Sequence, residues 1–341
     1  QVLRGFWYFA PDGTVAADTD FGSYEKTSDD PLTIVYTFNE KAVWSDGEPI
    51  DCDDFVLAWL AHSGLTGEKG FSAASTTGYE NQQKPQCADG DKKVTLVYDT
   101  PYADWAGLYG SNEIMPAHIL EKESGVADII AAAANPKDKA LEPAAKFWNS
   151  GWNLEPGQLK PEILPSAGPY TISDWQAQQS LTLKANPKWW GTPPKSETIV
   201  IRYLGGNQQV QALVNGEVNA MDPQPQVDLV QQLTDAGDKI KYSTGDQFTY
   251  EHLTLSFKGV FKDKAVREAF AKCVPRQQIV DNLIKPMNPN AGIHRPPGRT
   301  PSRRWSASSP GRSPRSSSWP GPGPWAGGTT TPAGRCRSSP S

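Results

Sequence analysis

No stretch of the 341-residue sequence is apolar for long enough to cross a bilayer as a helix. The nearest candidate, residues 126–134, is interrupted by Asp128 and is typical of an alanine-rich helix. The N-terminus also lacks the basic, apolar and small-residue pattern of a secretory signal. We therefore interpret Gln1 as a cut point and not as a natural start.

The sequence also lacks the motifs of the common enzyme classes. It has no nucleophile elbow, no H-E-x-x-H, no phosphate loop and no dinucleotide fingerprint. Its four histidines are not grouped with cysteines or carboxylates at ligand spacing, so we expect no metal site and no cofactor. Carboxylates are plentiful and the twelve tryptophans would suit stacking on sugars, so a secreted glycosidase with two catalytic carboxylates remains an alternative.

Positive charge is scarce over most of the chain. Residues 1–290 contain 25 basic and 38 acidic residues, which gives a formal charge of −13. Binding to nucleic acid needs a basic footprint for the phosphates, so this balance argues against a nucleic-acid partner. It suits a soluble, secreted protein and slightly favours cationic solutes.

Residues 294–341 lack every large aliphatic residue. They contain no Leu, Ile, Val, Met, Phe, Tyr, Lys, Asn, Asp, Glu or Gln, and this composition cannot build a core. We expect this tail to be disordered and interpret it as an out-of-frame translation of GC-rich DNA. A genuine basic, proline-rich interaction tail is the competing interpretation.

Cysteines are few, and none of the four lies in a C-x-x-C or zinc spacing. Cys52 opens a predicted helix and Cys87 lies just before a predicted strand, both within one candidate subdomain. If the chain is extracytoplasmic, disulfides are permitted, and we then favour a Cys52–Cys87 bridge. Two separate buried thiols are the alternative.

The clearest pattern of secondary structure in the sequence lies in residues 166–221, where predicted strands are followed by a predicted helix. Strands are predicted at 170–172, 181–183 and 199–203, and a short helix at 208–214 that stops at Asn215-Gly216. Further strands are predicted at 240–242 and 248–257. Strands alternating with a helix indicate a mixed sheet with helical cover, in the α/β class.

A second informative stretch is the sequence W-S-D-G-E-P-I at 44–50, which an acidic helix start follows. Asp46-Gly47 is typical of a tight turn. Asp51 can cap the helix, and Asp53 and Asp54 in the first turn favour the positive end of its dipole. We therefore assign these aspartates to a turn and to caps, in preference to a metal or acid–base cluster.

Taken together, these motifs resemble the peptide and nickel class of bacterial solute-binding proteins, the oligopeptide-binding type that serves ABC importers outside the cytoplasm. The resemblance includes G-P-Y at 168–170, N-P-x-x-W at 186–190 and N-G-E-V-N-A at 215–220, and it runs from about Pro31 to Asn290. It implies a two-lobed, periplasmic-binding-protein-like α/β fold, with the first lobe largely present and the second mostly missing. A signal segment and a first strand are then expected upstream.

The resemblance also implies a division of the chain. Residues 1–30, which look loop-rich, and 166–258 would hold the main sheet of the first lobe, and 31–165 a small subdomain. Residues 259–293 would open the second lobe, and 294–341 form the anomalous tail.

The implied function is capture of short peptides for delivery to a membrane permease, by a monomer that is not an enzyme. The protein would be secreted or lipid-anchored; a sugar-binding receptor is a further alternative. The candidate ligand-binding residues are Tyr79, Gln224, Tyr250, Glu251 and His252. Glu251 could meet a ligand cation, although an ion pair within the protein is equally compatible. Because the tail cannot replace a second lobe, we expect this chain to bind peptides far more weakly than a complete homologue.

Overall fold

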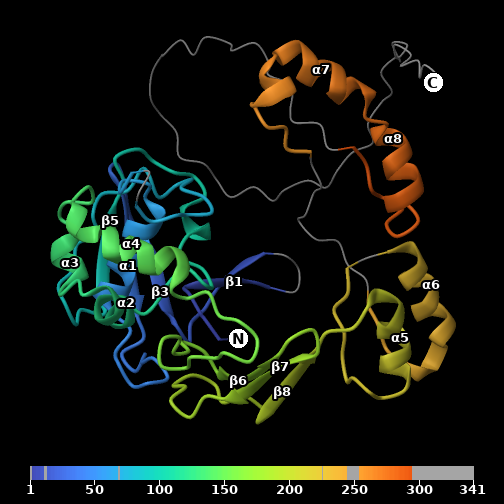
Figure 1. Ribbon diagram of the computed structural model, residues 1–341, viewed down its shortest axis with the longest axis horizontal. Helices are drawn as coiled ribbons and strands as arrows, with labels where there is room; N and C mark the ends of the chain where they lie inside the picture. The colour runs from blue at the N-terminus through green and yellow to red at the C-terminus, as the bar shows by residue number, and fades with distance from the viewer. Residues whose placement is uncertain (1, 11–13, 68–69, 225, 244–252, 294–341) are drawn as a thin grey trace, which may run out of the picture. The chain divides into compact units, whose positions relative to one another are not determined.

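A computed structural model describes residues 2–10, 14–67, 70–224, 226–243 and 253–293 (Figure 1). The chain divides into two compact units. Unit 1 comprises residues 1–223 with 236–248, and unit 2 comprises 224–235 with 249–341. The predicted disordered tail, 294–341, lies outside the described residues.

Unit 1 holds three small antiparallel sheets in the described part of the chain. They are β1 (Trp7–Phe9) with β2 (Val15–Ala17), β3 (Gly22–Asp29) with β4 (Leu32–Phe38) and β5 (Lys93–Val97), and β6 (Tyr170–Gln176) with β7 (Ser180–Ala185) and β8 (Thr198–Arg202). Residues 2–29 therefore contain three strands where we expected loops. The sequence pattern suggested loops because β2 and β3 lack a continuous apolar face.

Residues 166–221 follow the predicted order of elements. The structure places β6, β7 and β8 at the three predicted strands, and α5 (Gly206–Val214) at the predicted helix. Within the described residues these strands do not form the expected mixed sheet, however, because β6–β7 and β7–β8 both pair antiparallel. The physical reason is that neither connection, 177–179 or 186–197, contains a helix, whereas parallel neighbours are usually joined by a crossover helix.

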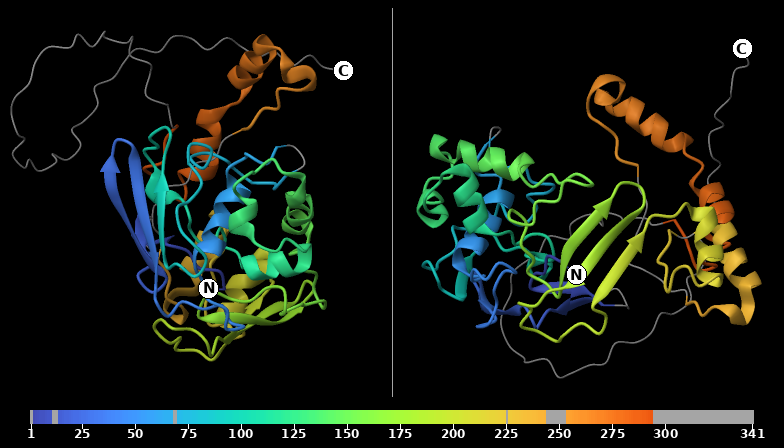
Figure 2. Two further views of the ribbon diagram at one scale, coloured as in Figure 1. Left: turned by 90° about the vertical axis from the view of Figure 1, so that its left-hand side faces the viewer. Right: turned by 60° about the horizontal axis from the view of Figure 1, so that its bottom comes forward.

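The main core of unit 1 lies between the β3–β4–β5 sheet and several helices. These are α1 (Cys52–His62), α2 (Ala117–Ser124), α3 (Ile129–Ala132) and α4 (Glu142–Ser150), with the 3₁₀ turns η1 (Trp105–Gly107) and η2 (Lys139–Leu141) between them. The left view of Figure 2 shows the helices on one side of the sheet. Strand β4 alternates between buried and half-buried residues, as a strand with one face on a core does. Its Tyr36 and Phe38 pack against Phe55 of α1.

Unit 2 is helical in its described part. Its elements are most of α6 (Val227–Ala236), then η4 (Gly259–Lys262), α7 (Lys264–Cys273), α8 (Arg276–Ile279) and the π-helical turn η5 (Val280–Ile284). Residues 237–239 of unit 1 form η3 (Gly237–Lys239), and the predicted strand at 240–242 is absent. The predicted strand at 248–257 is absent from its described part, 253–257, where Leu253 and Phe257 are exposed and have no strand beside them to complete a ladder.

The W-S-D-G-E-P-I loop is fixed by one buried carboxylate, that of Asp54. Its Oδ2 accepts hydrogen bonds from Trp44 Nε1 at 3.0 Å and from the Asp51 amide at 3.2 Å. Its Oδ1 accepts one from the Ala117 amide at 2.8 Å. Asp51 and Asp54 form a reciprocal capping box at the start of α1, so the cap roles predicted for them are confirmed. One side chain thus joins the loop, α1 and α2.

Two further links hold the same region. The ammonium group of Lys92 donates to the carbonyl oxygens of Ala42 and Ile50, at 3.1 and 2.8 Å, and so ties together the two ends of the loop. Cys52, the first residue of α1, forms a disulfide with Cys87, with 5.9 Å between their Cα atoms. This is the pairing that the sequence favours, and it connects α1 to the segment that leads into β5.

Replacing Asp54 with alanine should destabilise unit 1 by at least about 3 kcal/mol, because three buried N–H groups would lose their acceptor. The midpoint of urea unfolding, followed by tryptophan fluorescence, measures the effect. Asp104→Ala is the matched control, since Asp104 is exposed and makes no side-chain capping bond. Equal losses in the two variants would contradict the role assigned to Asp54.

Candidate functional site

The five predicted ligand-binding residues are not gathered in one place by the described structure. Tyr79 lies in unit 1 and is only 4% exposed. Gln224 is exposed and belongs to unit 2. Tyr250, Glu251 and His252 lie outside the described residues.

Tyr79 belongs to a buried polar network in unit 1. Its hydroxyl oxygen accepts a hydrogen bond from the Tyr109 amide at 3.2 Å, and the hydroxyl also bonds the Glu113 carboxyl. Glu113 Oε2 accepts the Gly110 amide at 2.6 Å. Burial raises the pKa of the Tyr79 hydroxyl and that of the Glu113 carboxyl. The Tyr79 hydroxyl therefore serves the interior of the unit and does not face solvent.

The network continues through Gln82. Its Nε2 donates to Tyr98 Oη at 2.9 Å, and its Oε1 accepts from the Tyr109 hydroxyl at 2.6 Å. Tyr109 itself has a φ of +60°, a left-handed conformation that costs energy for a residue with a Cβ. The tyrosine and glutamine contacts thus hold a strained turn in place.

This turn anchors the β1–β2 hairpin. The Phe6 amide donates to the Tyr109 carbonyl at 2.9 Å, and Trp7 Nε1 donates to the Leu108 carbonyl at 3.0 Å. Beyond these contacts the hairpin exposes Tyr8, Phe9 and Val15, at 47%, 67% and 45%. An anchored hairpin with exposed aromatic side chains can offer stacking and apolar contacts to a ligand.

A second cluster consists of carboxylates. Oxygen atoms of Asp51, Asp53 and Asp89 lie within 4.8 Å of one another, and such oxygens are the ligands that hard divalent cations prefer. Two of the three already have a role at the start of α1, because Asp51 is its cap and Asp53 Oδ1 accepts the Asp54 amide at 2.6 Å. The sequence indicates Asp51 and Asp53 but not Asp89, because only the folded chain brings residues 87–91 to this helix end.

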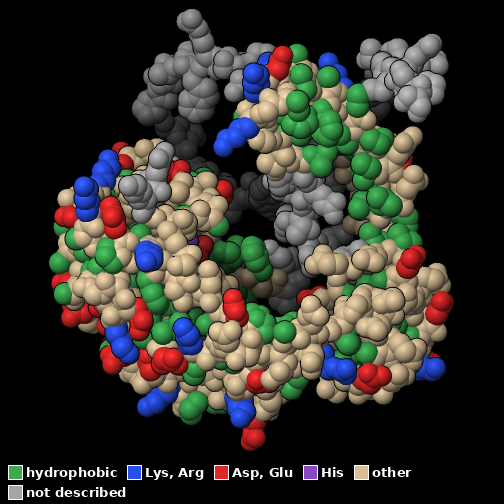
Figure 3. Space-filling view, viewed as in Figure 1, with side chains coloured by type: hydrophobic (Ala, Val, Ile, Leu, Met, Phe, Trp, Pro, Cys, Tyr) green, Lys and Arg blue, Asp and Glu red, His purple; other side chains and the backbone are tan. Residues whose placement is uncertain are grey.

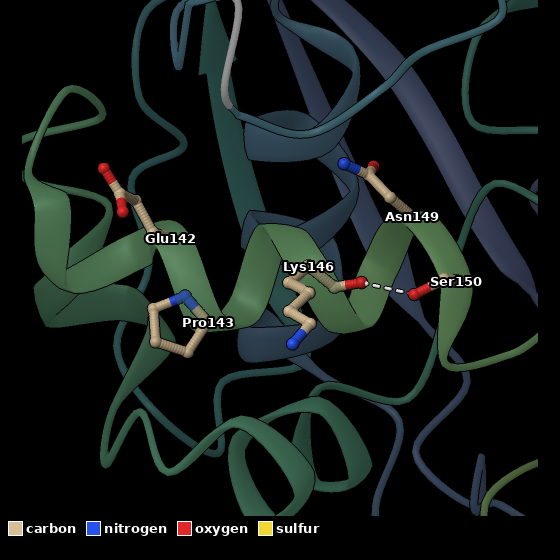
Figure 4. Close-up of a pocket in the computed structure, with 5 residues that line it drawn as sticks. All are labelled: Glu142, Pro143, Lys146, Asn149 and Ser150. Atoms are coloured by element: carbon tan, nitrogen blue, oxygen red, sulfur yellow. Dashed lines mark hydrogen bonds between the residues drawn. The ribbon is translucent and has the colours of Figure 1, made fainter.

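The surface of unit 1 adds a shallow feature on one helix. A hollow of about 640 Å³ is lined by Glu142, Pro143, Lys146, Asn149 and Ser150, all of α4 (Figure 4). Ser150 Oγ donates to the Lys146 carbonyl at 3.0 Å and so turns back onto its own helix. On the face seen in Figure 3, acidic and basic side chains are interspersed over the left-hand body. Neither feature singles out a ligand.

Stability near the Asp51–Asp53–Asp89 cluster should depend on pH. Burial, with Asp54 and Asp51 as further causes, raises the pKa of Asp53 to about 10. A carboxyl with a pKa raised by folding binds its proton more tightly in the folded state, so its contribution to stability is full below about pH 4 and is lost as the pH rises towards 10. Asp53→Asn should therefore match the wild type near pH 4 and exceed it in melting temperature at pH 8. A parallel shift at both pH values would contradict this, and Asp104→Asn is the control.

Tyr79→Phe should lower the free energy of unfolding by about 1–3 kcal/mol, because it leaves the buried Tyr109 amide without its acceptor. Denaturant unfolding measures the loss. Tyr8→Phe is the control, because Tyr8 is a surface residue of β1. If Tyr79→Phe leaves stability unchanged but weakens ligand binding, Tyr79 is a ligand contact and not a structural residue.

Within the described residues, no helix has the length and apolarity needed to cross a membrane. Curated relatives include an uncharacterised lipoprotein of Mycobacterium tuberculosis, which is 34% identical over 84% of this chain and 51% of its own length. The oligopeptide-binding protein OppA of the same species is 30% identical over 82% of this chain and 42% of its own length. The chain thus spans about half the length of the curated relatives it matches.

Solved structures show the same relationship. A periplasmic EDTA-binding protein, EppA, is 30% identical, with a TM-score of 0.56 over 69% of this chain and 40% of that one. The binding protein MoaA, solved with mannopinic acid, shares the fold with a TM-score of 0.56 at 20% identity, over 82% of this chain and 50% of that one. The predicted α/β, periplasmic-binding-protein-like fold is confirmed. The family model for the middle part of the family 5 bacterial extracellular solute-binding proteins matches residues 19–307, and the chain belongs to that family.

Proposed function

We propose that this protein is the extracytoplasmic receptor of an ABC importer and that it captures short peptides. The observation that carries the proposal is the 30% identity to an oligopeptide-binding protein over 82% of the chain. Extended peptides are commonly held through backbone hydrogen bonds to strands, with side chains in tolerant pockets. A receptor of this kind would hand its peptide to a membrane permease.

Chelated metal is a second candidate ligand class. The EDTA-binding protein is as similar in sequence to this chain as the oligopeptide-binding protein is. Against it stands the charge of residues 1–290, formally −13, because anionic chelates would be repelled by an acidic body. The peptide proposal is therefore favoured, and a peptide with a basic side chain or a free amino group suits the charge best.

The residues proposed to contact the peptide are Tyr79, Gln224, Tyr250, Glu251 and His252. Of these, Glu251 is the acidic group proposed to meet a ligand cation, and Gln224 would offer amide hydrogen bonds. Tyr79 would contact the peptide through its ring, since its hydroxyl already has partners within unit 1.

We also propose the subdomain division made from the sequence, with 31–165 as the small subdomain and 259–293 as the start of a second lobe. The relatives that are lipoproteins support a lipid-anchored or secreted location, and a monomer is proposed for the receptor. Neither enzymatic turnover nor a nucleic-acid partner is part of this function.

Isothermal titration calorimetry of the 341-residue chain tests the ligand class. One titration uses a mixture of short peptides, and separate titrations use EDTA or nickel–histidine. We expect heat from the peptides only, weaker than from a full-length homologue. Glu251→Gln should reduce affinity for peptides with basic groups, whereas Glu217→Gln should not, because exposed Glu217 faces Arg202 at 3.6 Å. Binding of the chelates alone would overturn the peptide proposal, and steady hydrolysis of a glycan would favour the glycosidase alternative.

A further inference from the structure

The disulfide of unit 1 lies in a dense group of carboxylates. Asp51 and Asp53 flank Cys52 in the chain, and Asp89 follows Cys87 by two residues. The side-chain oxygens of these three aspartates lie within 4.8 Å of one another, although they come from both ends of the cross-link. The bond between the two sulfur atoms therefore joins two acidic segments.

More acidic groups surround this core of charge. Asp91 accepts the Ala88 amide at 2.8 Å and is exposed, and Glu121 on α2 lies near enough to interact electrostatically with Asp89. The neighbouring cation is Lys92, which interacts with Asp51 and Asp53. Its ammonium group already donates to the Ala42 and Ile50 carbonyls, which hold it against the loop. Negative charge thus predominates around the disulfide.

Access to the two sulfur atoms is unequal. Cys52 is 0% exposed, whereas Cys87 is half-buried, so a reductant from solvent would attack Cys87 Sγ. In that step a thiolate bonds to Cys87 Sγ, the Cys52–Cys87 bond breaks, and its electron pair leaves on Cys52 Sγ, which then takes up a proton. A second thiol molecule displaces Cys87 from the mixed disulfide, so that two thiols become one disulfide and both cysteines are reduced.

We propose that these carboxylates shield the Cys52–Cys87 disulfide and discriminate against anionic thiol reductants. The attacking thiolate brings one negative charge to Cys87, two residues before Asp89, and the electron pair that leaves on Cys52 adds negative charge next to Asp51 in the chain. Repulsion between like charges raises the energy of this step. A thiol with additional carboxylates is penalised further, whereas a thiol with an ammonium group is attracted. The shield would keep α1 tied to residue 87 in the presence of anionic thiols.

The test compares three thiols on the folded 341-residue chain at pH 8 and low salt: anionic glutathione, neutral 2-mercaptoethanol and cationic cysteamine. Rates are normalised to thiolate concentration and to each thiol's rate with a neutral small disulfide. Alkylation followed by mass spectrometry reports Cys52 and Cys87 individually. We expect cysteamine to be fastest and glutathione slowest. Asp89→Asn should speed glutathione about two- to threefold, and 0.5 M salt should remove most of the difference between the thiols.

Asp89 is exposed, so its replacement by asparagine should leave the fold intact, and Asp91→Asn, at another exposed residue, provides a second test of the same charge group. Asp104→Asn, outside the group, should leave all three rates unchanged. Equal normalised rates for the three thiols would overturn the proposal. So would a glutathione rate that Asp89→Asn does not change, or rates independent of thiol concentration, which would mean that reduction waits for unfolding.

Discussion

The arrangement of unit 1 depends on one buried carboxylate. Asp54 is 0% exposed, and its two oxygens accept hydrogen bonds from the Trp44 ring, the Asp51 amide and the Ala117 amide. Burial raises the pKa of Asp54 to about 8, whereas the donors from Ala117 and Trp44 lower it. The hydrogen bonds from the fixed donors therefore offset the desolvation cost of burying the Asp54 carboxyl group. They do so only while the loop, α1 and α2 keep their positions.

The turn at 46–47 and the cap at the start of α1 could be predicted from the sequence because their causes are local. Asp51 and Asp54 stand at the start of an apolar helical run, where a cap is needed, and Asp46-Gly47 needs a turn because Gly47 has a φ of +110°. The elements β6, β7, β8 and α5 were also predictable, because the alternation of apolar and polar residues and the glycines that interrupt it lie within a few residues of each element. The parallel component expected for their sheet was wrong, since strand direction depends on connections and partners that alternation does not encode.

The candidate site was much harder to predict, because its contacts are far apart in the chain. The family resemblance made Tyr79 a candidate ligand contact, yet Tyr79 packs with Tyr109 and His62 and bonds to residues thirty or more positions away. Nothing in the sequence near residue 79 shows that a strained turn at Tyr109 needs its hydroxyl. Asp89 was missed for the same reason. The aromatic run at 6–9 does not alternate either, since Phe6 is buried whereas the neighbouring Tyr8 and Phe9 of β1 are both exposed.

The start of α1 shows how one set of charges can have two effects. A helix N-terminus favours acidic residues, and Asp51 and Asp53 follow from that preference alone. Burial, and then repulsion from Asp54 and Asp51, raise the pKa of Asp53, and the Asp89 carboxylate lies close to the same group. Such repulsion reduces the stability of the fold at neutral pH. The preferences of a helix N-terminus do not account for Asp89, because Asp89 caps nothing in α1. The disulfide offsets this repulsion by keeping α1 and residue 87 together, and the same carboxylates in turn oppose the anionic reductants that would break it.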